Sequence, residues 1–99
     1  MFDAYQLEVR RTAIDGLSAR DDILLGAIGL CGESGEVAEL VKKHVFHGDQ
    51  LDRTLLIGEM GDVLWYLAHL ANTLGISLED VAARNVEKLR RRYPDGFPR

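Results

Sequence analysis

The chain has 99 residues, of which 46% are hydrophobic and 28% are charged, and its formal net charge is −4. This composition is typical of a folded protein and excludes a disordered or fibrous one. The negative charge argues against nonspecific nucleic-acid binding, which depends on Lys and Arg neutralising phosphates. We therefore expect residues 1–99 to form a single helical domain with no nucleic-acid partner.

Cysteine content and hydropathy bear on where the protein acts. Cys31 is the single cysteine, so it forms no intrachain disulfide, and no secretory leader opens the sequence. Charged residues interrupt every apolar segment before it reaches the roughly 20 residues that cross a bilayer. We expect a cytoplasmic protein with no membrane partner.

Apolar residues recur at helical spacing along most of the chain, and no alternating pattern predicts a strand. Four helices are expected, from about Phe2 to Ile14, from Asp21 or Asp22 to about Val45, from roughly Leu51 to Leu74, and from the cap Ser77 to Tyr93. Gly48 and Gly75 follow the second and third helices, where glycine commonly ends a helix. Short loops between four helices make an all-α, antiparallel four-helix bundle the expected architecture.

The third predicted helix, from Leu51 to Leu74, is apolar on most of its circumference. Such a helix needs packing neighbours on several sides. A chain of this length would leave much of that surface exposed, so we expect at least a homodimer.

Two pairs of acids occur with a three-residue spacing, Glu33 with Glu36 and Glu59 with Asp62. On a helix, this spacing puts both carboxylates on one face, and antiparallel packing would bring the two pairs together. Carboxylates in an apolar helix need a partner, and a cation is the simplest one. Four carboxylates favour Mg²⁺ or Mn²⁺ over Zn²⁺. The alternative is a solvated face paired with Lys or Arg.

The fourth predicted helix carries Asn85, Lys88 and Arg92 on one side. An amide within an apolar stripe needs hydrogen-bond partners, and two cations beside it can meet a polyphosphate. The alternative is that cations near the end of this helix only favour its dipole. Lys43, which projects near Glu36, could belong to the same phosphate site.

Two further residues lie near the acids in the third helix. Trp65 could stack on a base, although an aromatic residue in a buried helix is more often part of the core. His69 is on the carboxylate face, and we expect it to support the site or the core rather than to bind metal.

Five glycines interrupt the two acidic segments, namely Gly29, Gly32, Gly35, Gly58 and Gly61. Each costs up to about 1 kcal/mol of helix stability relative to alanine. A close approach of helix backbones or of a ligand would compensate, whereas a simple kink at Gly29 and Gly32 is the alternative.

Taken together, these motifs resemble the MazG-like nucleotide pyrophosphohydrolases over nearly the whole chain. The matching segments are Tyr5-Gln6, Thr12-Ala13, residues 29–36 (GLCGESGE), Lys42-Lys43, residues 59–66 (EMGDVLWY) and residues 85–94 (NVEKLRRRYP). The two acid motifs are specific when they occur together in this order.

The resemblance implies hydrolysis of a (deoxy)nucleoside triphosphate to the monophosphate and pyrophosphate, in a dimeric or tetrameric helical assembly. It implies Mg²⁺ on Glu33, Glu36, Glu59 and Asp62, and substrate contacts from Lys43, Asn85, Lys88, Arg92 and Tyr93. The chemistry fits metal-assisted attack of water on the α-phosphorus. Glu36 is our choice for the general base, with Glu39 assisting, and nucleotide-pool house-cleaning is the expected role.

Two alternatives remain open from the sequence. Phosphoribosyl-ATP pyrophosphatase has a similar bundle and similar acid motifs, although Trp65-Tyr66 and the segment from Asn85 to Phe97 favour the MazG group. The other is a non-catalytic helical module that oligomerises or binds a partner. The preferred base is not determined by residue spacing.

Overall fold

The computed structural model describes residues 1–99 and contains four helices and no strand. Their bounds are Phe2–Thr12 for α1, Ala19–His47 for α2, Arg53–Leu74 for α3 and Leu78–Arg92 for α4. The all-helical prediction is therefore confirmed. None of these helices is both long and apolar enough to cross a membrane.

Local capping determines where these helices begin and end. Ser18, Asp52 and Ser77 are the N-caps of α2, α3 and α4, and each side chain accepts a hydrogen bond from a backbone N–H three residues on. Gly48 and Gly75 end α2 and α3 with left-handed backbones, at φ values of 72° and 68°. The predicted stops at both glycines are confirmed.

Four predicted boundaries were wrong by two or three residues. Helix α2 ends at His47 rather than near Val45, and α3 begins at Arg53, after its cap Asp52, rather than near Leu51. Helix α1 ends at Thr12 rather than near Ile14, because Ala13 already has an extended backbone. Helix α2 begins at Ala19, because the hydroxyl of Ser18 caps it before the acids that we took as its start.

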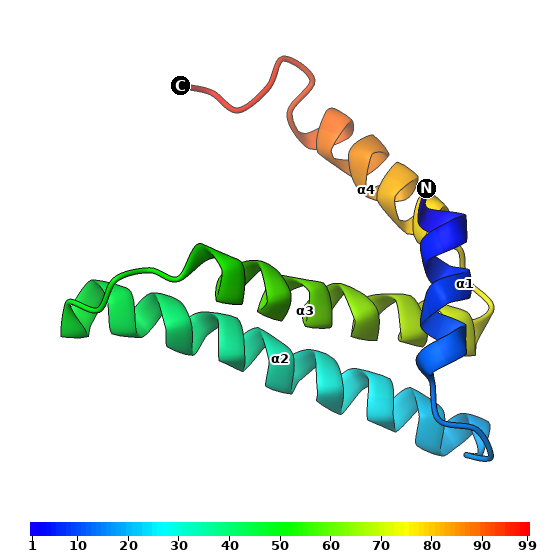
Figure 1. The fold of residues 1–99 in the computed structure, drawn as a ribbon. Helices are drawn as coiled ribbons and strands as arrows, with labels where there is room; N and C mark the ends of the chain where they lie inside the picture. Colours follow the sequence, from blue (N-terminus) through cyan, green and yellow to red (C-terminus); the bar gives the residue numbers. More distant parts are fainter.

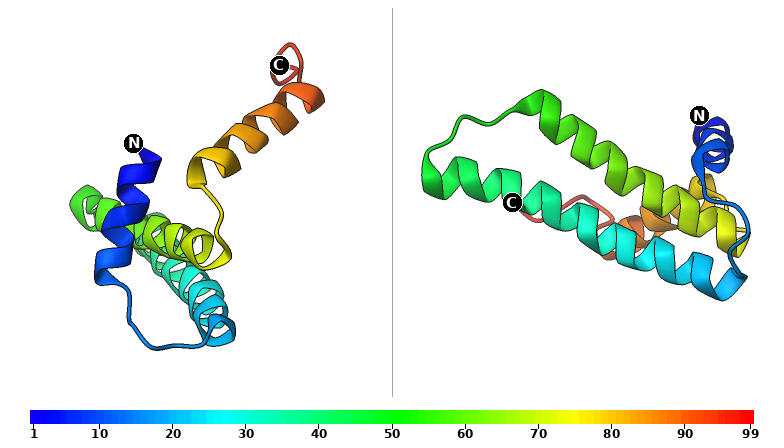
Figure 2. Two further views of the ribbon diagram at one scale, coloured as in Figure 1. Left: turned by 90° about the vertical axis from the view of Figure 1, so that its right-hand side faces the viewer. Right: turned by 60° about the horizontal axis from the view of Figure 1, so that its bottom comes forward.

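The long helices α2 and α3 pack against each other as an antiparallel hairpin (Figure 1). Helix α1 crosses one end of α3, and α4 contacts α1. Figure 1 and the left view of Figure 2 show α4 projecting away from the hairpin. A single chain therefore does not close four helices around one core, which corrects the expected four-helix bundle at the level of the monomer.

The core is small and lies where α1, α3 and α4 meet. Its buried apolar residues are Val9, Ala68, Ala71 and Leu78, with Phe2, Tyr5 and Trp65 packed against them. The apolar stripe of α1, formed by Phe2, Tyr5 and Val9, thus faces this core. Most large apolar side chains of α2 and α3 remain exposed.

A buried amide joins the helices at this core. The Gln6 side chain donates to Asn72 Oδ1 and to the Ile76 carbonyl, both at 3.0 Å, and accepts from the backbone N–H of Leu78 at 2.9 Å. Asn72 Nδ2 donates in return to the Gln6 carbonyl. One residue of α1 therefore connects the end of α3, the following loop and the first turn of α4.

Candidate functional site

Three carboxylates converge between the two long helices. Glu33 comes from α2 and Glu59 and Asp62 come from α3, and one oxygen from each lies within 4.8 Å of the others. The three-residue spacing puts Glu59 and Asp62 on the face of α3 that meets α2. Glu33 and Glu59 are partly buried, whereas Asp62 is exposed. This cluster, hereafter the carboxylate group, is open to a ligand on the Asp62 side.

The carboxylate group lacks a cationic partner within the chain. No ion pair of the structure involves Glu33, Glu59 or Asp62. The pKa of Glu33 is raised, first by loss of solvation, then by the charge of Asp62 and by hydrogen bonding to Glu59. The group therefore favours binding a proton or a cation, and its oxygen-only donor set suits a hard divalent ion.

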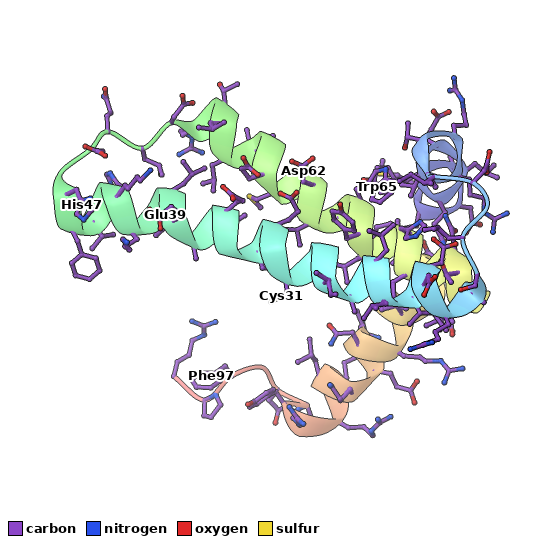
Figure 3. The ribbon with its side chains drawn as sticks, turned by 90° about the horizontal axis from the view of Figure 1, so that it is seen from below. Cys31, Glu39, His47, Asp62, Trp65 and Phe97 are labelled. Atoms are coloured by element: carbon purple, nitrogen blue, oxygen red, sulfur yellow. The ribbon has the colours of Figure 1, made fainter.

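An aromatic hollow of about 280 Å³ adjoins the carboxylate group. Its lining consists of Glu33, Asp62, Trp65 and Tyr66. Figure 3 shows Trp65 following Asp62 along α3, toward the end that α1 crosses. Tyr66 lies so close to the α2 backbone that a Cβ at Gly29 would overlap its ring. The close helix approach predicted from glycine is confirmed at Gly29.

The other glycines divide into two groups. Gly26 also lies against α3, where a Cβ would approach Leu70 Cδ1 at 3.3 Å. In contrast, a Cβ at Gly32, Gly35, Gly58 or Gly61 would meet no atom of the chain within 4 Å. Packing within one chain therefore explains the need for glycine at Gly26 and Gly29, and it leaves the other four glycines unexplained.

Helix α1 contributes residues that the sequence alone did not assign to the site. The pKa of Tyr5 is raised, first by burial and then by the charge of Asp62, so the charge of the carboxylate group acts on the Tyr5 hydroxyl. Thr12 Oγ1 accepts a hydrogen bond from Trp65 Nε1 at 2.8 Å. Both residues belong to segments that carry the family resemblance, Tyr5-Gln6 and Thr12-Ala13. However, no local sequence pattern shows that α1 crosses α3 beside Asp62.

A second, polar hollow of about 470 Å³ lies beside the carboxylate group. Its lining residues are Asp52, Thr54, Leu55, Gly58, Glu59 and Asp62. Asp62 borders both hollows, since it also lines the aromatic one. An extended ligand with one aromatic end and one charged end can therefore lie across the carboxylate group.

Glu36 and Lys43 are not joined to the carboxylate group. Glu36 is exposed and lies outside the three residues whose oxygens converge, although its charge contributes to the raised pKa of Glu33. Lys43 Nζ lies 3.8 Å from a carboxylate oxygen of Glu39, which also pairs with Lys42. The structure thus brings together three of the four predicted metal ligands.

The predicted substrate residues of α4 are not brought to the carboxylate group of their own chain. Asn85, Lys88, Arg92 and Tyr93 are all exposed. Helix α4 leaves the hairpin because Gln6 holds its first turn against α1. Asn85 lies in the expected apolar stripe, but only the start of that stripe, at Leu78, is buried in the monomer.

These features define an all-helical protein with a carboxylate site suited to a hard divalent ion and an aromatic hollow beside it. The chain belongs to the family described as the MazG nucleotide pyrophosphohydrolase domain, whose family model matches residues 26–97. The matched segment contains all three members of the carboxylate group and the predicted α4 residues. The family therefore makes this protein a nucleotide pyrophosphohydrolase by class.

Two curated relatives are similar to this chain. Gene 37 protein of Mycobacterium phage L5 is 40% identical over 102 residues, covering 95% of this chain and 90% of the relative. Uncharacterized protein YvdC of Bacillus subtilis (strain 168) is 38% identical over 73 residues, covering 65% of this chain and 69% of the relative. No solved structure matches the chain.

Proposed function

We propose that the protein hydrolyses a (deoxy)nucleoside triphosphate to the monophosphate and pyrophosphate, using Mg²⁺ held by Glu33, Glu59 and Asp62. The observation that carries the proposal is the convergence of three carboxylates without a cationic partner. Bound there, Mg²⁺ (or Mn²⁺) would offset the charge of the triphosphate and polarise the phosphorus that is attacked. Cleanup of unwanted nucleotides is the role that we propose.

The chain's own residues would orient the substrate and move the proton. The aromatic hollow at Trp65 and Tyr66 suits a base, and the second hollow, made acidic by Asp52, Glu59 and Asp62, would take the phosphates with Mg²⁺ offsetting the repulsion. Glu36 stays our choice for the general base, because it is near the carboxylate group without being one of its members. It would take the proton of the attacking water.

A second copy of the chain is part of the proposal. The accessible surface is 7676 Å², whereas a compact monomer of 11.1 kDa exposes about 5,700 Å². The excess, about 2,000 Å², is comparable to the surface that each chain of an obligate dimer buries. The radius of gyration of 16.4 Å also exceeds the roughly 13 Å of a compact 100-residue domain.

An apolar groove between α2 and α3 is the surface that a second copy would cover. The groove measures about 490 Å³, and its lining includes Val37, Met60, Val63, Leu64 and Leu67. Leu67→Glu should shift the protein toward monomer in sedimentation equilibrium, since a charge there would be buried in the dimer. Ile14→Glu, at an exposed residue between α1 and α2, is the matched control.

The same assembly would supply the missing cations. We propose that α4 of one copy brings Asn85, Lys88, Arg92 and Tyr93 to the carboxylate group of the other. Subunit complementation tests this arrangement by co-expressing an Asp62→Asn chain with a Lys88→Ala chain. One site of the heterodimer then combines the wild-type carboxylates of the Lys88→Ala chain with the wild-type α4 of the Asp62→Asn chain, so activity returns. If the residues worked within one chain, neither site would be intact.

Hydrolysis itself is tested by pyrophosphate release. Purified protein is incubated with Mg²⁺ and a panel of standard, methylated, oxidised and deaminated nucleoside triphosphates. Asp62→Asn should abolish release without unfolding the protein, and Glu8→Gln, on the exposed side of α1, should not change it. A folded wild-type protein that releases no pyrophosphate from any substrate would favour the non-catalytic helical module.

A further inference from the structure

A row of side chains from three helices leads to the aromatic hollow. His69 Nε2 and Asp22 Oδ1 are 3.0 Å apart, joining α3 to the first turn of α2. The His69 and Trp65 rings are stacked, with centroids 5.1 Å apart and planes at 11°. Trp65 Nε1 then donates to Thr12 at the end of α1. The Trp65 ring, held between His69 and Thr12, forms one wall of the hollow.

These contacts determine the orientation of the indole ring. The last torsion of a tryptophan side chain has broad preferences, so its ring plane must be held by neighbours. His69 covers one side of the ring, Thr12 holds its N–H, and Tyr66 packs edge-on at 5.0 Å. Rotation of the indole would break the stack and the hydrogen bond together.

His69 is itself held in place. Its side chain is 5% exposed, and its ring lies near Gly26, where a Cβ would meet His69 Cδ2 at 3.6 Å. With a carboxylate as acceptor, the proton is on Nε2, which fixes the tautomer and the ring orientation. Asp22 is therefore the anchor of the row, although it lies outside the carboxylate group and the hollow.

We propose that Asp22 and His69 are positioning residues that hold Trp65 as the stacking surface for the base of the bound nucleotide. The nature of the ligand rests on the proposed function. A hollow of about 280 Å³ lies near the lower limit of ligand pockets, so it suits a base rather than a whole nucleotide. Any base offers a π face for such stacking.

The chain offers a direct readout, because Trp65 is its only tryptophan. Its fluorescence is titrated with an α,β-methylene nucleoside triphosphate analogue, which cannot release pyrophosphate, and, separately, with inorganic tripolyphosphate, both with Mg²⁺. Tripolyphosphate has the phosphates but no base. Binding is thereby measured without turnover, so a failure of the proposed hydrolysis is distinguished from a failure of this inference.

Two variants loosen the ring from opposite ends. Asp22→Ala removes the anchor of His69, and Asp21→Ala, an exposed acid in the same helical turn, is its control. Thr12→Val removes the acceptor of the indole N–H, and Thr12→Ser retains it. Because Thr12 is exposed, its variants keep the test valid even if loss of the Asp22 anchor impairs folding.

Asp22→Ala and Thr12→Val should weaken nucleotide binding by about threefold to tenfold, the cost of ordering one free side chain. Tripolyphosphate binding should be unchanged, and both controls should bind as wild type. In turnover assays KM should rise by the same factor while kcat stays within about twofold. Any one of three results would overturn the proposal. The variants could lose tripolyphosphate affinity as much as nucleotide affinity, both variants could bind the nucleotide like the wild type, or the wild type could show no base-dependent change in fluorescence.

Discussion

Replacing Gln6 by leucine should destabilise the protein strongly, although both side chains have a similar size. The substitution removes three side-chain hydrogen bonds and leaves the N–H of Leu78, the carbonyl of Ile76 and Asn72 Oδ1 without their partner. Leu78 is 7% exposed, so water cannot easily replace the bond to its N–H. This N–H belongs to the first turn of α4, which has no acceptor within its own helix.

The expected loss is about 3 kcal/mol, because an unsatisfied buried group costs roughly 1–3 kcal/mol and the two acceptors are partly hydrated. For a domain of this size, that corresponds to a drop of about 12–24 °C in the melting temperature. Circular dichroism at 222 nm measures the transition, at one fixed protein concentration because a dimer's stability depends on it.

Arg10→Gln is the control for Gln6→Leu, since Arg10 is an exposed residue of the same helix. Its effect should stay within about 0.5 kcal/mol. Asn72→Leu should resemble Gln6→Leu, and the double variant should cost less than both singles added together, because the two amides share their bonds. A melting temperature within 3 °C of wild type for Gln6→Leu, on the order of the control effect, would refute the role of this network.

Two further predictions concern the hairpin. A raised folded-state pKa means that ionised Glu33 destabilises the metal-free protein as pH rises above the ordinary value of 4.5 and through the folded pKa. Glu33→Gln should therefore have a higher melting temperature than wild type at pH 7 without metal, and the same melting temperature at pH 4. A pH series in which this difference does not shrink toward pH 4 would contradict the reasoning. Gly29→Ala should lower the melting temperature through overlap with Tyr66, costing about 1–3 kcal/mol. Gly32→Ala, whose added methyl group meets no neighbour, should raise the melting temperature in the same thermal scan, because it adds up to about 1 kcal/mol of stability.

Local patterns predicted most of the secondary structure. Caps and stops depend on residues within one helical turn, so Gly48, Gly75 and Ser77 could be recognised without the fold. The convergence of Glu33 with Glu59 and Asp62 also followed, because a three-residue spacing and antiparallel packing are enough to predict it, whereas the expected place of Glu36 in the same cluster did not. The missed cap Ser18 is a local signal too, obscured by the two acids that follow it.

The direction of α4 could not be predicted in this way. It depends on the contact between Gln6 and Leu78, which are 72 residues apart. Gln6 and Asn85 are both amides within apolar stripes, and the reasoning applied to Asn85 holds for Gln6. The difference is that the stripe of α1 packs on α3 in the same chain, whereas the stripe of α4 contacts α1 only at its start, through Leu78.

Helix register places Glu36 within reach of the carboxylate group, although its side chain lies outside the group. Gly26 lies against His69 and Gly29 against Tyr66, so each step forward on α2 corresponds to an equal step back on α3. Continuing this register sets Glu33 opposite Asp62, and Glu36 opposite Glu59.

A rotation of the Glu36 side chain would then bring it beside Glu59, where it can act on a water without holding the ion. Glu36→Gln should accordingly retain most of the rise in melting temperature that Mg²⁺ produces, about 2.7 kcal/mol of stabilisation at one hundred times the dissociation constant. It should nevertheless lose pyrophosphate release, because an amide cannot accept the proton. Asp62→Asn should lose both. If Glu36→Gln loses the Mg²⁺ stabilisation as completely as Asp62→Asn does, then Glu36 is a metal ligand and another group is the base.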